Sequence, residues 1–183
     1  PDPGTEKENK LTRILALDLS LTATGWAITP DHFGVERTAG TFRGAERLLE
    51  YRHWLRRMLL PGFNQAVIEG YAYGRHNKAH QIGELGGVVR LTLQEEDVPY
   101  LEVPPTVLKK YATGRGNAPK PDMRMELYKR SGMDVADDNT VDAIWLLAVG
   151  RELAGDPLFE IPKANREALK KLELPEGIPN DPR

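Results

Sequence analysis

The length, composition and charge of the chain exclude several classes of protein. Its 183 residues fit one domain, and the absence of cysteine excludes a disulfide scaffold, a thiolate zinc site and a cysteine nucleophile. With 25 Lys and Arg against 27 Asp and Glu, the net charge is only −2, so any nucleic-acid-binding surface must be local. No apolar run approaches the roughly 20 residues of a membrane helix, and the polar start lacks a signal-peptide core. We therefore expect a cytoplasmic protein without a membrane partner.

Alternating apolar residues predict three strands near the start of the chain, at about 13–19, 24–30 and 35–42. Residues 30–34 are typical of a hairpin turn between the second and third strands. The preceding residues 1–11 are charged and interrupted by proline, which predicts a flexible N-terminal arm.

Helices and strands alternate in the rest of the chain. The pattern predicts a helix at 45–60, a strand at 65–70, a helix at 77–96, a strand at 99–103, and helices at 104–111, 120–130 and 137–153. This order favours an α/β fold with a five-stranded mixed sheet, its first three strands antiparallel, and helices on both faces. We expect it to form one domain over residues 12–154, followed by a proline-rich tail, 155–183, with a short helix near 164–172.

Asp18 ends the first apolar run and is the first candidate site residue. A buried carboxylate without a partner is costly, so Asp18 must take up a proton, find a cation or hold a metal. The alternative is that Asp18 caps the following turn through Ser20 or Thr22.

Two further elements deliver acids. Glu69 ends the fourth predicted strand, and Asp142 lies in the last long helix, directly before a buried segment. Asp138 and Asn139 precede Asp142 by four and three residues and can share its helix face. Asp137 could simply be the N-cap of that helix. Oxygen ligands alone suit Mg²⁺ or Mn²⁺, and two such ions bridged by a carboxylate are a common device for phosphodiester hydrolysis.

These residues resemble a known family, the RuvC-type Holliday junction resolvases of the ribonuclease H-like superfamily. The resemblance rests on Leu17–Ser20 and Thr24–Ala27 in the first hairpin, Ile68-Glu69, Asp142-Ala143, and the loop Thr113–Ala118 with Lys120. It covers about residues 13–153. It implies a ribonuclease H-like fold and a crossover junction endodeoxyribonuclease that uses two Mg²⁺ ions per active site, with Mn²⁺ as a substitute.

The resemblance also implies site residues. Asp18, Glu69 and Asp142 match the family's catalytic and metal-binding acids. The family usually has Asp or His three residues before the last acid, where this chain has Asn139. We prefer Asp138 as the fourth ligand because a neutral amide is a poor Mg²⁺ ligand beside an available carboxylate.

A basic segment lies between residues 109 and 130, where seven Lys or Arg residues stand against two acids. Gly114 and Gly116 would let backbone amides approach phosphates, whereas an ordinary solvated helix face is the simpler explanation. We expect this segment to contact DNA through Lys109, Lys110, Arg115, Asn117 and Lys120.

The segment that follows Glu69 mixes aromatic and cationic residues. It predicts a base-stacking and phosphate-contacting loop with Tyr71, Tyr73, Arg75 and Lys78, although either tyrosine could instead pack in the core.

Three other functions fit parts of the pattern. An actin-like kinase would need glycines directly after Asp18, where Leu19-Ser20-Leu21 stand, so we expect no nucleotide cofactor. An RNA-processing nuclease of the same superfamily and a non-catalytic nucleic-acid-binding module remain alternatives. The leading hypothesis is paired, symmetric cleavage of four-way junction DNA. It predicts a homodimer, for which the Gly83–Val89 helix face offers small residues.

Overall fold

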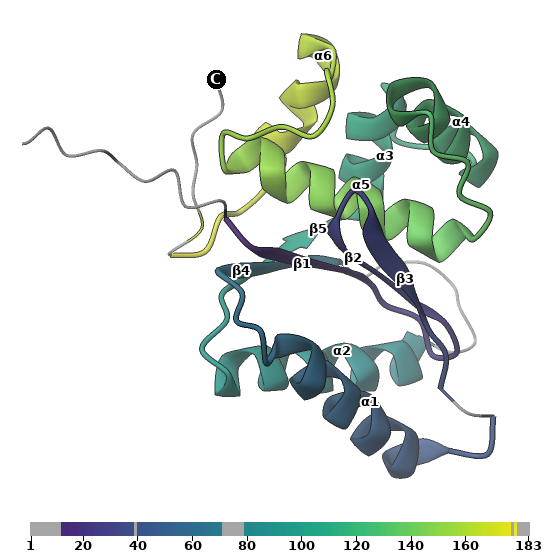
Figure 1. Ribbon diagram of the computed structural model, residues 1–183, viewed down its shortest axis with the longest axis vertical. Helices are drawn as coiled ribbons and strands as arrows, with labels where there is room; N and C mark the ends of the chain where they lie inside the picture. Colours follow the sequence, from purple (N-terminus) through teal and green to yellow (C-terminus); the bar gives the residue numbers. More distant parts are fainter. Residues whose placement is uncertain (1–11, 39, 71–78, 177, 179–183) are drawn as a thin grey trace, which may run out of the picture.

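Five strands form one mixed sheet between two layers of helices in the computed structural model, which describes residues 12–38, 40–70, 79–176 and 178 (Figure 1). The strand order is β3-β2-β1-β4-β5. The first three strands pair antiparallel, as the sequence predicted, and β4 and β5 complete the mixed sheet parallel to β1. The strands are β1 Ile14–Asp18, β2 Thr24–Thr29, β3 His32–Glu36, β4 Gln65–Glu69 and β5 Tyr100–Val103.

The helices cover both faces of this sheet. Figure 1 shows α1 and α2 on one face, and α5 lying directly on the other with α3, α4 and α6 around it. The bounds are α1 Gly44–Leu59, α2 Ala79–Glu95, α3 Pro105–Thr113, α4 Lys120–Ser131, α5 Asp138–Leu153 and α6 Lys163–Arg166, followed by a 3₁₀ helix, η1, at Glu167–Lys171. No helix in the described part of the chain is long and apolar enough to cross a membrane.

The alternation of side chains along β1 divides the core into two clusters. Leu15 and Leu17 pack with α1 and α2, whereas Ile14 and Ala16 pack with α5. Because successive strand residues point to opposite faces, Asp18 follows Ile14 and Ala16 onto the α5 face. The sheet itself thus directs the first candidate acid toward the helix that carries Asp142.

The third strand differs from the prediction. It spans His32–Glu36 rather than 35–42, because only Pro30 and Asp31 form the turn and the Asp31 carboxylate accepts a 2.6 Å hydrogen bond from the Thr29 hydroxyl. Gly34, which we assigned to the turn, lies within the strand. A β-carbon on Gly34 would be 2.9 Å from the Trp26 ring, so this glycine makes room for the indole.

Helix α2 corrects one expectation about its glycine-rich face. Leu85 and Val89 are almost fully buried in the chain's own core, so they are not available to a second molecule. The open side of the helix carries Gly83, Gly87 and Leu91, of which Leu91 is 56% exposed. A β-carbon on Gly83 or Gly87 would meet nothing within 4 Å among the described residues.

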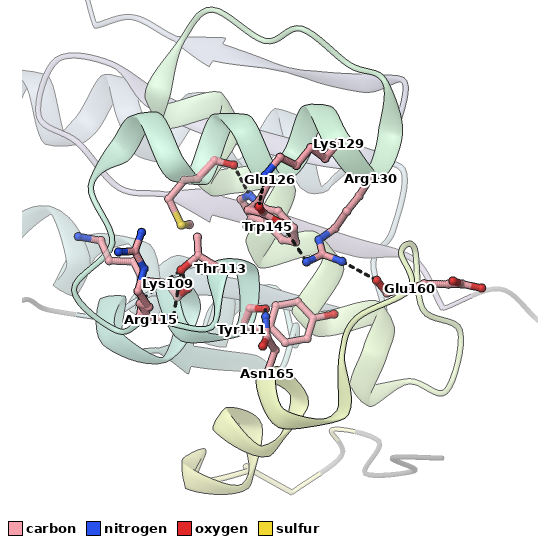
Figure 2. A network of polar contacts seen from close by, with 11 residues as sticks. Lys109, Tyr111, Thr113, Arg115, Glu126, Lys129, Arg130, Trp145, Glu160 and Asn165 are labelled. Carbon is pink, nitrogen blue, oxygen red and sulfur yellow. Dashed lines mark hydrogen bonds and ion pairs between the residues drawn. The ribbon is translucent and has the colours of Figure 1, made fainter.

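The segment after α5 packs onto the helical layer. Ile161, Ala168 and Leu169 are buried in the cluster that surrounds α5, and the Asn165 side chain donates a 3.1 Å hydrogen bond to the Tyr111 carbonyl of α3 (Figure 2). The short helix predicted near 164–172 is present as α6 and η1.

Candidate active site

The parallel pairing of β1 with β4 brings two of the predicted acids together. The register pairs Leu17 with Ile68, so Asp18 and Glu69 follow as neighbours at the carboxyl ends of both strands. Burial, then the nearby Glu69 charge, raises the pKa of Asp18, and burial raises the pKa of Glu69. Asp18 is only 6% exposed.

A glycine in β2 lets helix α5 approach this end of the sheet. Gly25 pairs with Asp18 across the β1–β2 hairpin, and a β-carbon built on it would lie 2.0 Å from the Asn139 carbonyl oxygen. Any larger residue would therefore push the first turn of α5 away from the sheet. One turn further along α5, Asp142 is close enough to raise the pKa of Asp18 electrostatically.

Burial raises the pKa of all three acids, and neighbouring carboxylates raise the pKa of Asp18 and Asp142 further. Burial, then the charges of Glu69 and Asp142, hold the pKa of Asp18 well above its usual range. Burial and then Glu69 raise the pKa of Asp142 to about 7. Burial also raises the pKa of Glu69, against the hydrogen bond from Asp18 and nearby Lys120 and Lys109. A cluster of buried carboxylates that resists ionisation is a typical cation-binding environment.

The donor set of this cluster fits a hard divalent cation. It offers carboxylate oxygens without sulfur or imidazole, which suits Mg²⁺ or Mn²⁺ better than zinc. Within the described residues, no three His, Cys, Asp or Glu side chains are already arranged as a metal-binding group.

The first turn of α5 gives different roles to three neighbouring polar residues. Asp137 is the N-cap, as one reading of the sequence had it, and accepts hydrogen bonds from the Asn139 and Thr140 amides. The Asn139 side chain donates a 2.8 Å hydrogen bond to the Ala23 carbonyl in the β1–β2 turn. Asp138 is exposed, raises the pKa of Asp142, and has a carboxylate oxygen 3.8 Å from Lys120 Nζ.

The turn after β1 is closed by a residue other than Asp18. The Thr24 hydroxyl donates a 3.1 Å hydrogen bond to the Ser20 carbonyl and accepts one from the Ser20 amide. These two bonds pair the backbone groups of the turn, so Asp18 is not needed as its cap. The Asp18 carboxyl instead faces Glu69 and Asp142.

Two lysines of the predicted basic segment lie near the acids. Lys120, at the start of α4, lowers the pKa of Asp18, Glu69 and Asp142, and Lys109, in α3, lowers that of Glu69 and Asp142. Neither lysine is buried, so both remain accessible to a phosphate at the mouth of the cluster.

The other predicted DNA-contacting residues lie further from the acids or outside the described residues. Arg115 is exposed and forms an ion pair with Asp122, Asn117 is exposed in the loop before α4, and Lys110 is half-buried near the end of α3. Tyr71, Tyr73, Arg75 and Lys78 lie outside the residues that the structure describes.

Gly25 is the residue whose role sequence reasoning missed. Gly25 belongs to the Thr24–Ala27 part of the family motif, but the motif does not predict its contact with α5. A glycine inside a strand often marks a close approach of another backbone, and that signal was present.

Comparisons with known proteins identify the family and the fold. No model of a protein family matches the chain. The crossover junction endodeoxyribonuclease RuvC of Roseiflexus sp. (strain RS-1) is 30% identical over 145 residues, covering 73% of this chain and 86% of the relative. The RuvC protein of Synechococcus sp. (strain WH7803) is 25% identical over 149 residues, covering 75% of this chain and 97% of the relative.

Solved structures show the same fold. A Thermus thermophilus RuvC structure superimposes with a TM-score of 0.63 at 20% identity, covering 79% of this chain and 97% of the other. A second, described as T. thermophilus RuvC in complex with Holliday junction substrate, gives the same TM-score and identity over 74% of this chain and 90% of the other. The fold is therefore ribonuclease H-like. With the Roseiflexus relative matched over most of its length, the chain belongs to the RuvC family of crossover junction endodeoxyribonucleases.

Proposed function

We propose that this protein is a Mg²⁺-dependent endonuclease that resolves four-way (Holliday) DNA junctions by paired symmetric nicks. The observation that carries the proposal is the meeting of Asp18, Glu69 and Asp142, each from a different element, with Lys109 and Lys120 beside them. Membership of the RuvC family implies a nuclease that depends on a divalent metal. Its DNA substrate leads us to expect that it acts inside the cell.

Asp18, Glu69 and Asp142 would hold the cations in this proposal. A pair of bound Mg²⁺ ions would supply an activated water and stabilise the leaving oxygen. The residues themselves would fix the geometry: Asp18 and Glu69 are held in register by the β1–β4 pairing, and Asp142 by the contact of α5 with β2. Lys109 and Lys120 would orient the phosphate from the open side.

Asp138 is our proposed fourth ligand. Its carboxylate is exposed on the same helix face as Asp142 and has only a long contact with Lys120, whereas the Asn139 amide is engaged by the Ala23 carbonyl. We expect Asp138→Asn to slow cleavage more than Asn139→Ala at limiting Mg²⁺. Asn139→Ala should instead lower thermal stability, because it removes a hydrogen bond between α5 and the β1–β2 turn. The reverse order of cleavage rates would assign the fourth position to Asn139.

A homodimer is the assembly that this function requires, because one acid cluster cuts one strand at a time and the junction has two-fold symmetry. We propose that the open side of α2 forms the interface, since Gly83 and Gly87 permit close helix approach and exposed Leu91 offers apolar area. Leu91→Arg should give a folded monomer by sedimentation that binds junctions poorly. Leu49→Arg, at a similarly exposed position of α1, is the matched control. If the wild-type protein sediments as a monomer both with and without junction DNA, this assembly is excluded.

Parallel cleavage assays test the reaction and the substrate together. The protein is incubated with Mg²⁺ and labelled four-way junction, linear duplex or RNA–DNA hybrid, with Asp142→Asn as the inactive control. We expect cleavage of the junction alone by the wild-type protein. Preferential cleavage of the hybrid would favour an RNA-processing nuclease, and binding without cleavage of any substrate would favour a non-catalytic module.

A further inference from the structure

A pocket of about 530 Å³ opens on the outer face of α4, beside the acid cluster. Its apolar walls are Pro121, Met125 and Tyr128, and its polar rim is formed by Lys120, Arg124, Asp134 and Asp138. A volume of this size lies within the range of small-molecule sites in proteins. None of the apolar residues was among the predicted DNA contacts.

The apolar residues in this pocket are not explained by the packing of α4. The helix buries Met123 and Leu127, which are at most 1% exposed, against the core. Met125 and Tyr128 are each 53% exposed on the other side. An exposed aromatic and a methionine that share a hollow indicate a surface that receives something flat and apolar.

The inner face of α4 is firmly attached, so the pocket is presented on a rigid support. The Trp145 indole nitrogen of α5 donates a 3.1 Å hydrogen bond to the Met123 carbonyl. Arg130 donates to the Glu126 carboxylate and, at 2.7 Å, to the Glu160 carbonyl of the C-terminal segment (Figure 2). A site on a pre-organised helix loses little conformational freedom when its ligand binds.

The charges at the rim balance, and this decides which ligand fits. Lys120 lies 3.8 Å from Asp138, and Arg124 lies 2.5 Å from Asp134, so two cations face two carboxylates. A neutral pocket does not select a phosphate. It does offer both donors and acceptors around an aromatic wall, which matches the π-face and polar edge of a nucleobase.

We propose that this pocket binds an unstacked base of the DNA strand being cut, with the base face against Tyr128 and its edge toward Arg124 and Asp134. The inference rests on the proposed nuclease function and adds a base contact to it. Lys120 and Asp138 border both the pocket and the acid cluster, so the base would belong to a nucleotide next to the phosphate that is cleaved. Tyr128 would be a positioning residue with some influence on where the strand is cut.

The test combines removal of the aromatic ring with removal of single bases. A series of junctions is prepared in which each carries one abasic site, at a different position along the cleaved strand. The cleavage rate of every junction is measured with wild-type protein, Tyr128→Ala and Tyr128→Phe. We expect one abasic position near the cut to slow the wild-type enzyme about tenfold, and Tyr128→Ala to slow intact junctions about as much. The alanine variant should no longer respond to that abasic position, because the contact is already lost.

Two controls separate stacking from other effects. Tyr128→Phe keeps the ring and should behave as wild type, whereas Leu49→Ala removes a similarly exposed apolar side chain from α1 on the opposite layer and should change nothing. Thermal unfolding checks that each variant is folded. The proposal is wrong if Tyr128→Ala keeps the wild-type abasic profile, or if Tyr128→Phe is as slow as the alanine variant. A pocket used by a protein partner would give the first of these results.

A binding measurement distinguishes failure of this proposal from failure of the nuclease function. A 2-aminopurine base placed near the expected cut brightens when it leaves the stack of its neighbours and is quenched when it lies against an aromatic ring. We expect the bound complexes of wild type and of Tyr128→Phe to be dimmer than the complex of Tyr128→Ala. This pattern without any cleavage would support the base pocket and overturn the nuclease function. Junction cleavage with equal emission from all three complexes would overturn the base pocket alone.

Discussion

The Asn139 carbonyl lies so close to Gly25 that a β-carbon on the glycine would be 2.0 Å from its oxygen. Real β-carbons do not approach an oxygen so closely, and the obstacle is backbone rather than a flexible side chain. This contact sets the height of α5 above the sheet at the end where Asp18 and Asp142 meet. The same helix is also close at its far end, where a β-carbon on Gly150 would lie 2.8 Å from Val67 Cγ2.

Gly25→Ala should therefore reduce both stability and activity. The first turn of α5 would have to move, and a displacement of about 1 Å at a reacting centre can slow an enzyme on the order of a hundredfold. Thermal unfolding and junction cleavage measure the two effects. Gly40→Ala is the control, because a β-carbon there meets nothing within 4 Å among the residues that the structure describes. A Gly25→Ala protein with unchanged melting temperature and cleavage rate would contradict this geometry.

The isosteric amides Asp18→Asn, Glu69→Gln and Asp142→Asn should each abolish cleavage while leaving junction binding intact. Each substitution keeps the shape of the side chain but removes a negative charge that would hold the cation. Binding should be equal or slightly tighter, because a negative charge leaves the path of the DNA. Cleavage gels and fluorescence anisotropy on the same junction provide both readouts. Nicking that persists in any of the three variants would remove that residue from the metal site.

The raised pKa of Asp142 predicts a pH-dependent stability in the absence of metal. As pH rises from about 4 to about 7, the Asp142 carboxyl ionises in the unfolded chain but keeps its proton in the folded one. Unfolding therefore becomes easier over this window, and above it the full penalty, on the order of a few kcal/mol, remains. Asp142→Asn removes that penalty.

Melting temperatures with EDTA compare the two proteins. The melting temperature of Asp142→Asn should be clearly higher than that of wild type near pH 8, and only slightly higher near pH 4. Added Mg²⁺ should raise the melting temperature of wild type more than that of the variant. An equal difference at both pH values would show that the acid cluster imposes no such penalty.

Neutralising Lys109, Lys110, Arg115 and Lys120 together should weaken binding to every DNA shape and flatten its salt dependence. Each phosphate contact that is lost should reduce the log–log slope by about 0.9. Preference for the junction over duplex should survive, because these contacts read the backbone. Replacing Lys163, Lys170 and Lys171, which are exposed on α6 and η1, is the control. An unchanged slope in the fourfold variant would show that these residues make no phosphate contacts and form an ordinary solvated surface.

The acids could be found from the sequence because their signal is local. Asp18 and Glu69 each end a short apolar run, and in a sheet such runs are strands whose ends carry the site. The two-residue period then fixes the face on which each carboxyl lies. The third strand was misplaced because Gly34 is typical of a turn, and only the three-dimensional contact with the Trp26 ring explains it within a strand.

The parts that the sequence could not supply depend on contacts between distant residues. Gly25 touches Asn139 across more than a hundred positions, and no periodicity reveals such an approach. On α2, Leu85 and Val89 were assigned to a partner because helical spacing does not say which of two apolar sides faces the chain's own core. The pocket at Tyr128 needed Asp134 and Asp138 brought beside α4.

Cleavage of a supercoiled plasmid that extrudes a cruciform tests whether the protein makes paired nicks, because the two nicks must fall within the lifetime of one complex. Paired cleavage across the four-way junction relaxes the cruciform and yields linear plasmid, whereas a single nick yields an open circle. We expect wild-type protein with Mg²⁺ to give linear product from the first time points, and Asp142→Asn to give none. An open circle that accumulates first and is linearised only after rebinding would contradict paired resolution by this protein.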